Sequence, residues 1–536
     1  MKKSQARPTS DSDLFLVAQL AAAVSIGSFF YHLRHGDLLL YGDAVAHINI
    51  ARRVFDSQTP GLLQLGTVWL PLQHLFILPF VISDWLWRSG VAGSIPSMIA
   101  FVLATVGIFR LVRCLMADKP ALAWIAAAIF AANPNLLYLQ SIAMTEVLYL
   151  ALFIWSLVFF SEFVRSKNND WLMKCGWCVM GSSLARYDGW FLAAGLLIAA
   201  VVLRPGKRIV IRLVLLAMSG PVLWLAYNAA VYRNPLEFAD GPYSAKAIER
   251  RSIAAGNARH PGTGNILIAG AYFLKSAQLN VAGKNALQPL WPGVALIGAL
   301  SSLPYLHRKL PALAKSQSRT QPLVVLLWLP LLFYAWSVAY GGVPIYVPDW
   351  WPHSRYNTRY GIEMLPAFCV CAVLAVNALF DATGGLRLRR AMAVAALALL
   401  VLSYASTWRD PITLTEARVN GQTRIALEKE VAQYLSALPA GSTLLMYVGD
   451  HVGALQQAGI PLRRVINEGN HRVWKRPTDP DGLWEQALAN PRRFADFVIA
   501  FEGDPVAQQA DKTNLTALAV LHVSGQPEAV IYRARR

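Results

Sequence analysis

The sequence has 536 residues, of which 55% are hydrophobic and 15% are charged, and its formal net charge is +18. A soluble protein of this length needs more charged surface, so this composition excludes an ordinary soluble domain as the main body of the chain. The Lys and Arg residues stand at the ends of apolar stretches, not on one soluble face, which argues against a nucleic-acid partner and favours contact with membrane lipids.

Apolar runs of roughly 20 residues, the length that a helix needs to cross a bilayer, follow one another through most of the chain. They lack the alternation of barrel strands, so we predict a bundle of transmembrane α-helices. The predicted spans are 14–33, 67–87, 91–112, 121–138, 144–164, 171–186, 189–204, 208–232, 287–306, 322–341, 359–381 and 391–408. The run 67–87 is the weakest because Pro71 and Pro79 interrupt it, and we expect about 11 to 13 crossings.

Three long loops, 34–66, 233–286 and 342–358, separate the spans. Short basic clusters fall at alternate turns, in 165–174, 204–212, 308–319 and 387–390. Because short basic loops face the cytoplasm, the three long loops are expected on the outer side. The cation excess in 233–286 runs against this rule; an anionic ligand would explain it, although long loops also tolerate translocated charge.

The apolar spans end at Trp408, and residues 409–536 alternate between helical and strand patterns. An amphipathic helix is predicted around 424–438, strands at 443–448 and 497–501, and a final strand pair around Ser524-Gly525. We therefore divide the chain into a membrane module, 1–408, and a soluble α/β domain, 409–536, on the outer side.

Ionisable residues at the ends of spans are candidates for function because charge is costly in a bilayer. Asp43 and His47 in the first loop are four residues apart and share a face if that segment is helical, although Asp43 also suits a simple helix cap. Glu146 begins another predicted span, where it would also complement the helix dipole. Arg186 and Asp188 occupy a tight turn between two spans and would also pair with each other.

The loop before residue 360 combines basic and aromatic side chains. Arg355 and Arg359 are four residues apart, and the Arg fork matches phosphate oxygens. His353 and Tyr360 beside them suit contact with headgroups or sugar rings. The alternative is an aromatic belt with snorkelling arginines.

These motifs, taken in chain order, resemble those of a known family. They are an Asp-bearing first outer loop, Thr145-Glu146 at a span start, the Arg-Tyr-Asp-Gly-Trp turn at 186–190, and Asn357-Thr358-Arg359-Tyr360-Gly361 followed by Leu365-Pro366. Together they are similar to the GT-C class of membrane glycosyltransferases, and more narrowly to the bacterial branch related to protein mannosyltransferases and to the enzyme that adds aminoarabinose to lipid A.

The resemblance implies a GT-C bundle in the inner (plasma) membrane. It implies transfer of a sugar from a polyprenyl-phosphate donor to a lipid, glycan or protein acceptor at the outer face. Asp43 would then be the base that prepares an acceptor hydroxyl, with Glu146 as a second catalytic carboxylate. Arg355, Arg359 and Tyr360 would bind the donor phosphate. The cavity wall implied by the resemblance comprises His47, Arg186, Asp188 and His353.

Other functions stay open at this point. No cofactor is indicated, and the histidines lack metal-ligand spacing. A transporter or flippase for an anionic lipid-linked substrate predicts ionisable residues near the middles of spans, and these are sparse. A non-catalytic assembly subunit that recruits partners through its outer α/β domain is the third alternative.

Overall fold

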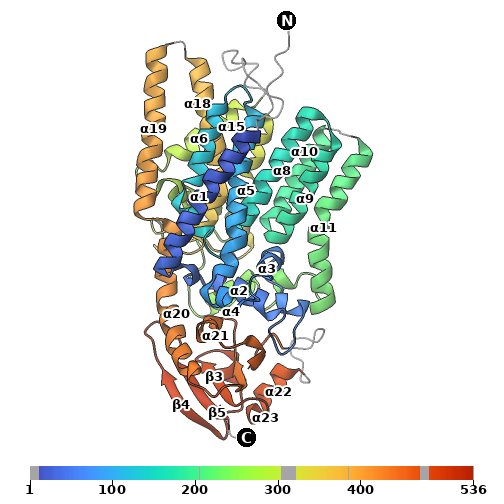
Figure 1. Cartoon of the computed structure of the whole chain (residues 1–536), viewed down its shortest axis with the longest axis vertical. Coiled ribbons are helices and arrows are strands. Elements are labelled where there is room, and N and C mark those ends of the chain that lie inside the picture. Colours follow the sequence, from blue (N-terminus) through green and yellow to red (C-terminus); the bar gives the residue numbers. More distant parts are fainter. Residues whose placement is uncertain (1–10, 204–205, 304–320, 384, 471–481, 535–536) are drawn as a thin grey trace.

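The computed structural model describes residues 11–203, 206–303, 321–383, 385–470 and 482–534, and it is a long helical bundle with a small sheet at one end (Figure 1). The predicted basic cluster at 308–319 and residue Arg204 lie outside the described residues. The predicted helical class and membrane character are confirmed, because several helices have the length and apolarity of membrane spans.

Eleven of the twelve predicted spans, all except 67–87, correspond to helices of the bundle, and α14 is an additional helix that was not predicted. These helices are α1 (Asp11–His35), α5 (Val91–Leu115), α6 (Pro120–Ala131), α8 (Thr145–Ser166), α9 (Asn169–Ala185), α10 (Asp188–Leu203), α11 (Lys207–Tyr232), α14 (Ile266–Ala282), α15 (Leu290–Ser301), α17 (Leu329–Tyr340), α18 (Leu365–Ala382) and α19 (Leu386–Arg409). Among the described residues, seven helical segments are long and apolar enough to cross a membrane, and four more apolar helices are shorter. The count of about 11 to 13 crossings stays a prediction.

Two stretches differ from the expected pattern. Residues 67–87 do not form one helix but two short ones, α3 (Leu72–Ile77) and α4 (Asp84–Ser89), because proline interrupts the run and the polar side chains of Gln73 and His74 are buried there. Conversely, the loop 233–286 contains the apolar helix α14, besides α12 (Glu237–Asp240) and α13 (Ala245–Ala254).

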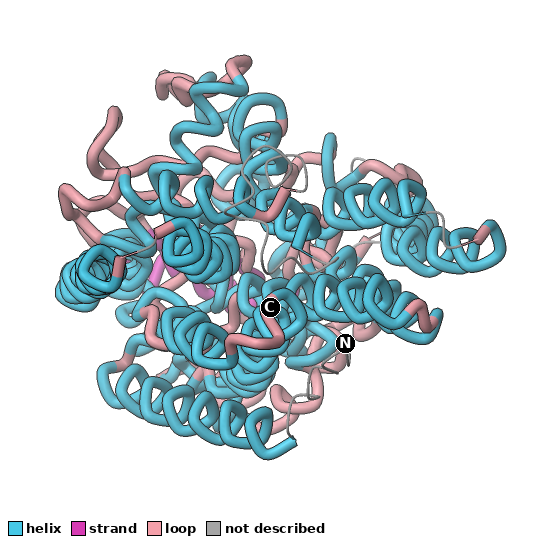
Figure 2. The backbone as a smooth tube through the Cα atoms, turned by 90° about the horizontal axis from the view of Figure 1, so that it is seen from above, coloured by secondary structure: helices cyan, strands magenta, loops and turns pink. Residues whose placement is uncertain are grey.

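Short elements gather at the end of the bundle that faces the sheet. The first loop forms η1 (Asp37–Leu39), α2 (Gly42–Arg53) and η2 (Leu62–Leu65), and α7 (Pro134–Leu139) follows α6. The 3-10 helix η5 (Thr358–Met364), which precedes α18, also lies at this end, whereas a second one, η4 (Gln321–Trp328), leads into α17 at that helix's other end. Viewed from above, the strands lie beneath the helices of the bundle (Figure 2).

The C-terminal part holds a five-stranded sheet in the order β2-β1-β3-β5-β4. Its strands are β1 (Leu444–Met446), β2 (Val465–Ile466), β3 (Phe497–Phe501), β4 (Leu515–Leu521) and β5 (Ala529–Ala534). The β1, β2 and β3 strands are parallel, whereas β5 runs antiparallel to both β3 and β4. The short elements around the sheet are α21 (Val452–Ala458), η6 (Leu462–Arg464), α22 (Leu483–Ala489), α23 (Pro491–Phe494) and α24 (Pro505–Gln509).

Helix α20 (Ile412–Ser436) connects the bundle to the sheet, and it is longer than the predicted helix at 424–438. Its first turns are buried against the bundle through Ile412 and Leu414, and its last turns bury Val431 and Leu435. Figure 1 shows α20 descending from the end of the bundle alongside the strands. This helix therefore brings C-terminal residues to the same end of the bundle as the first loop.

Candidate functional site

Three chain segments that are far apart in sequence meet at Arg359. Its Nη2 donates to Asp43 Oδ2 at 2.5 Å, its Nε to Glu146 Oε1 at 3.1 Å, and its Nη1 to Glu416 Oε1 at 3.3 Å. Asp43 comes from α2, Glu146 from the first turn of α8 and Glu416 from α20. Three carboxylates thus surround one guanidinium, and each uses a different nitrogen.

The three carboxylates differ in their access to solvent. The side chains of Glu146 and Glu416 are 0% and 1% exposed, whereas that of Asp43 is 38% exposed. Asp43 is not a helix cap, since Tyr41 is the N-cap residue of α2 and makes no side-chain cap bond. Asp43 is therefore the partner of Arg359 that faces outward.

The backbone around Arg359 is fixed from behind by α14. The Thr358 carbonyl accepts from Ser276 Oγ at 2.7 Å and from Asn280 Nδ2 at 2.7 Å. Gly361 permits this approach, because a Cβ there would lie 2.4 Å from the backbone carbon of Ser276. Arg359 therefore projects from a rigid support.

A second arginine, Arg186, extends the cluster into the bundle. Its guanidinium lies 3.3 Å from Glu146 Oε1, 3.2 Å from Asp188 Oδ2 and 3.0 Å from Glu363 Oε1. Arg186 and Asp188 do pair, as expected, but the pair is part of a larger network. We call Asp43, Glu146, Arg186, Asp188, Arg359, Glu363 and Glu416 the carboxylate–arginine cluster.

Neutral side chains complete the arrangement. Arg186 donates to Thr145 Oγ1 at 2.7 Å and to the Tyr334 hydroxyl at 2.6 Å. The Tyr360 ring lies between the two guanidiniums, 5.0 Å from Arg186 and 4.9 Å from Arg359. A guanidinium over an aromatic face is stabilised electrostatically, so the Tyr360 ring stabilises both cations.

Five carboxylates share two arginines in this cluster. Among the described residues, Glu146 Oε2, Asp188 Oδ1 and Glu363 Oε2 are buried oxygens without a hydrogen-bond partner. Buried charges without full compensation are costly, which marks this end of the bundle as built for something other than stability. Within the described ranges, no group of three or more His, Cys, Asp or Glu is arranged to hold a metal ion.

His47 is close to this cluster but belongs to a separate histidine pair. Its Nδ1 lies 2.8 Å from His74 Nε2, and its ring packs 4.9 Å from that of Trp69. Burial, together with the positive charges of Arg359 and Arg186, lowers the pKa of His47 to about 3. His47 is therefore neutral at physiological pH.

Two predicted site residues lie apart from the cluster. Arg355 and Arg359 do not share a helix face, because Asn357 between them is in the left-handed region with φ of 56° and the helix starts only after it. His353 is exposed, and its Nδ1 lies 3.2 Å from the Pro348 carbonyl. The expected grouping of Arg355 with Arg359 is therefore not seen.

Three residues of this network were not among the predicted site residues. Glu363 is a lone acid inside an apolar span, and this signal was available. Glu416 and Tyr334 gave no such signal, because the first stands beyond the last span and the second is one aromatic residue in an apolar run. Their roles follow only from the folding of distant segments onto Arg359 and Arg186.

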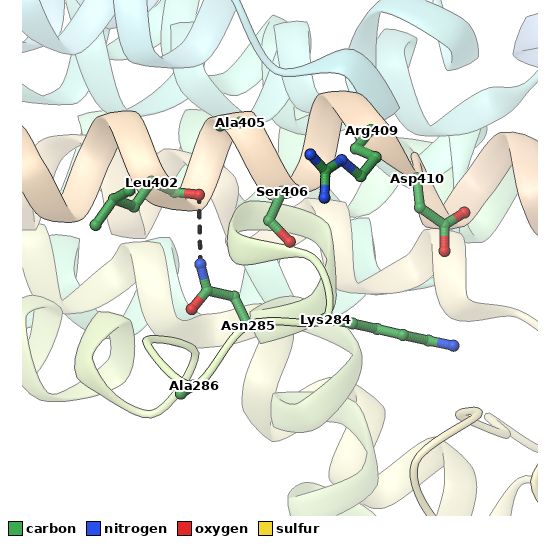
Figure 3. A pocket seen from close by; sticks show the side chains of 8 residues that line it. All are labelled: Lys284, Asn285, Ala286, Leu402, Ala405, Ser406, Arg409 and Asp410. Carbon is green, nitrogen blue, oxygen red and sulfur yellow. Dashed lines mark hydrogen bonds between the residues drawn. The ribbon is translucent and has the colours of Figure 1, made fainter.

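An open pocket of about 500 Å³ lies elsewhere, beside the end of α19 (Figure 3). It is lined by Lys284, Asn285, Ala286, Leu402, Ala405, Ser406, Arg409 and Asp410. Asn285 Nδ2 donates to the Leu402 carbonyl across it at 3.3 Å. None of these residues belongs to the carboxylate–arginine cluster, so this pocket is separate from the candidate functional site.

The fold and the cluster define a class of protein, namely a helical membrane protein with a small α/β region at one end of the bundle. The buried charges gather at that same end. The same overall fold occurs in ArnT from Cupriavidus metallidurans. The crystal structure of that protein bound to undecaprenyl phosphate matches with a TM-score of 0.55 at 14% identity, over 98% of both chains. Its apo structure matches with a TM-score of 0.52 at 15% identity, over 96% of this chain and 97% of that one.

The apo oligosaccharyltransferase of Archaeoglobus fulgidus gives a TM-score of 0.49 at 12% identity, over 92% of this chain and 70% of that one. A scan of protein-family models and a search of curated proteins both found no match. The likeness to ArnT establishes that the chain has a GT-C fold, and it confirms the predicted resemblance at that level.

Proposed function

We propose that this protein is a glycosyltransferase of the inner (plasma) membrane that takes a sugar from a polyprenyl-phosphate donor and transfers it to a lipid, glycan or protein acceptor at the outer face. The observation that carries the proposal is the position of Arg359. It is held by two buried carboxylates and presents its remaining nitrogen beside the half-exposed Asp43. ArnT, which has the same fold, was crystallised with undecaprenyl phosphate.

In this proposal the donor phosphate binds Arg359 through Nη2. A guanidinium stabilises the negative charge that grows on the leaving phosphate as the glycosidic bond breaks. Asp43 accepts the proton of the acceptor hydroxyl, whose oxygen then forms the new bond to the anomeric carbon of the sugar. The electrons of the broken bond leave with the polyprenyl phosphate, so that charge and atoms balance.

This chemistry places one demand on the ion pair between Arg359 and Asp43. The attacking hydroxyl and the leaving phosphate lie on opposite sides of the anomeric carbon in a direct displacement. Asp43 and the phosphate therefore cannot both occupy Nη2 of Arg359. We propose that donor binding breaks the Asp43–Arg359 contact and so releases Asp43 to act as the base.

The test uses the purified full-length protein with labelled polyprenyl-phosphate sugars and a panel of lipid, glycan and peptide acceptors. Transfer of label into any acceptor supports the proposal, and transfer into none contradicts it. A parallel assay in vesicles measures movement of labelled donor across the membrane. Movement without any covalent product would favour the transporter or flippase alternative instead.

A further inference from the structure

Glu416 lies beyond residue 408, the expected end of the membrane module, and yet it contacts the centre of the cluster. Its Oε1 accepts from the Asn357 N–H at 3.1 Å and from Arg359 Nη1 at 3.3 Å. Its Oε2 accepts from the Thr358 N–H at 2.7 Å and from the Thr358 hydroxyl. One buried carboxylate therefore satisfies four donors within three consecutive residues.

These donors belong to the start of a long helical segment. The first N–H groups of a helix lack partners within the helix, and a carboxylate satisfies both their hydrogen bonds and the local dipole. The N-cap residue Asn357 makes no side-chain cap bond, and its Nδ2 donates to the Pro344 carbonyl at 2.8 Å. Glu416 caps the η5–α18 segment from another part of the chain.

Helix α20 also holds the segment that carries Asp43. Arg424 Nη2 donates to the carbonyls of Leu39 and Leu40, each at 3.0 Å. The Tyr41 hydroxyl donates to the Thr413 carbonyl at 2.9 Å. Gly421 lets the two segments touch, since a Cβ there would lie 2.5 Å from the Leu40 carbonyl oxygen. Helix α20 therefore fixes the segment that carries Asp43 relative to the segment that carries Arg359.

We infer that Glu416 is a positioning residue: it fixes the Arg359 guanidinium and the backbone beneath it so that Nη2 is the nitrogen left for a ligand phosphate. This inference rests on the proposed function and names a residue beyond the expected membrane module. Glu416 itself repels a phosphate, because both are anionic. Its contribution therefore lies in geometry and not in affinity.

In Glu416→Gln we expect kcat to fall while the Kd for undecaprenyl phosphate does not rise appreciably. The variant loses a negative charge near Arg359, so the Kd for undecaprenyl phosphate stays within about 3-fold of wild type or decreases. The new amide NH2 faces only other donors, so Arg359 keeps its contact with the phosphate but loses the orientation needed in the transition state, and kcat falls by about 10- to 100-fold. A residue that bound the phosphate directly would instead raise the Kd when lost.

The matched control is Glu430→Gln, an exposed acid on the same helix, for which wild-type kcat and Kd are expected. Glu416→Asp keeps the charge but shortens the reach, so it should recover only part of kcat. If Glu416→Gln does not fold, Thr358→Val removes the hydroxyl donor alone, and a smaller fall in kcat at constant Kd is expected. An unchanged kcat in a folded Glu416 variant, or a Kd that rises in step with the loss of rate, overturns the inference.

A thermal double-mutant cycle tests the inference even if the wild type transfers no sugar, in which case the proposed function fails separately. Asp43→Asn and Glu416→Gln both remove a partner of Arg359, so their combined change in melting temperature should differ from the sum of the single changes. Asp43→Asn with Glu430→Gln should be additive. Additive behaviour of the first pair would show that Glu416 does not position Arg359.

Discussion

The two arginines of the carboxylate–arginine cluster have similar partners but different surroundings. Arg186 contacts Glu146, Asp188 and Glu363, whose carboxylates are all buried, together with two hydroxyls. Arg359 has two buried carboxylate partners and one that is 38% exposed. Because only Arg359 has an exposed carboxylate partner, we propose that a ligand exchanges with a carboxylate at Arg359 and not at Arg186.

The elements that supply the partners explain this difference. Arg186 follows α9 and ties together the starts of α8 and α10, the middle of α17 and the η5 segment, which are parts of the rigid bundle. The outward partner of Arg359 lies on α2, in the loop between the first two long helices. Helix α2 itself is largely buried, but the Asp43 side chain is exposed, so its carboxylate can change rotamer when a ligand arrives while the helix stays in place. We therefore assign a structural role to Arg186 and a ligand-binding role to Arg359.

The largest effect is expected for Asp43→Asn. Loss of a general base lowers kcat by about 10²- to 10⁴-fold. Because Asp43 competes with the phosphate for Arg359 Nη2, the same substitution should leave the Kd for undecaprenyl phosphate unchanged or lower. Kinetics with a saturating labelled donor and direct binding titrations give the two numbers. Full activity of the variant would show that Asp43 is not a catalytic residue. A higher Kd would contradict the proposal that the phosphate displaces Asp43 from Arg359.

Matched substitutions of the two arginines separate binding from stability. In Arg359→Lys the charge remains but the fork is lost, so the Kd for undecaprenyl phosphate should rise by about 10-fold or more. In Arg186→Lys the Kd should stay near the wild-type value. The melting temperature should fall instead, because hydrogen bonds to charged groups contribute about 1.5–3 kcal/mol each and several are lost.

The comparison would fail if the two variants behaved alike. A large rise in Kd for Arg186→Lys at an unchanged melting temperature would place the ligand deeper in the bundle than Asp43. Measuring both variants in the same detergent and at the same salt concentration removes the ionic-strength dependence of phosphate binding.

The sequence allowed much of this cluster to be predicted, and the reasons for the failures are physical. Glu146, Arg186, Asp188 and Arg359 stand at the ends of apolar runs, where the cost of burying charge makes any ionisable residue informative, and Asp43 was predicted from its position in the first long loop. Glu416 could not be found in this way, because its importance depends on how α20 folds back onto η5. Helical spacing also gave a wrong expectation for Arg355, since the left-handed Asn357 separates it from the helix.

The histidine pair predicts a pH dependence of stability. The pKa of His47 is lowered to about 3, below its ordinary value of about 6.5 in an unfolded chain. As the pH falls below about 6.5, the unfolded state takes up this proton and the folded state does not, so stability falls by up to about 1.4 kcal/mol per pH unit. His47→Gln removes this proton uptake.

Melting temperatures at pH 7.0 and 5.0 test this prediction. Wild type should lose more stability between these values than His47→Gln does, although a slope remains because burial also lowers the pKa of His74. The transfer rate of wild type should not titrate with His47 in this interval, because His47 stays neutral in the folded protein. Equal losses in wild type and variant would mean that the folded protein protonates His47.

The smallest effect is expected for Arg355→Ala. This variant tests whether Arg359 alone, or Arg355 as well, binds the donor phosphate. Among the described residues, no hydrogen bond or ion pair joins the Arg355 side chain to the cluster, and its carbonyl accepts from Asn420 Nδ2 at 2.8 Å. The Arg355 side chain is partly exposed, and an ion pair at such a site contributes about 0.2–1 kcal/mol, so the Kd for undecaprenyl phosphate should change by less than about 5-fold. A rise comparable to that of Arg359→Lys would show that residues 349–356 fold over the phosphate on binding, and that the outward edge of Arg359 is only part of the donor site.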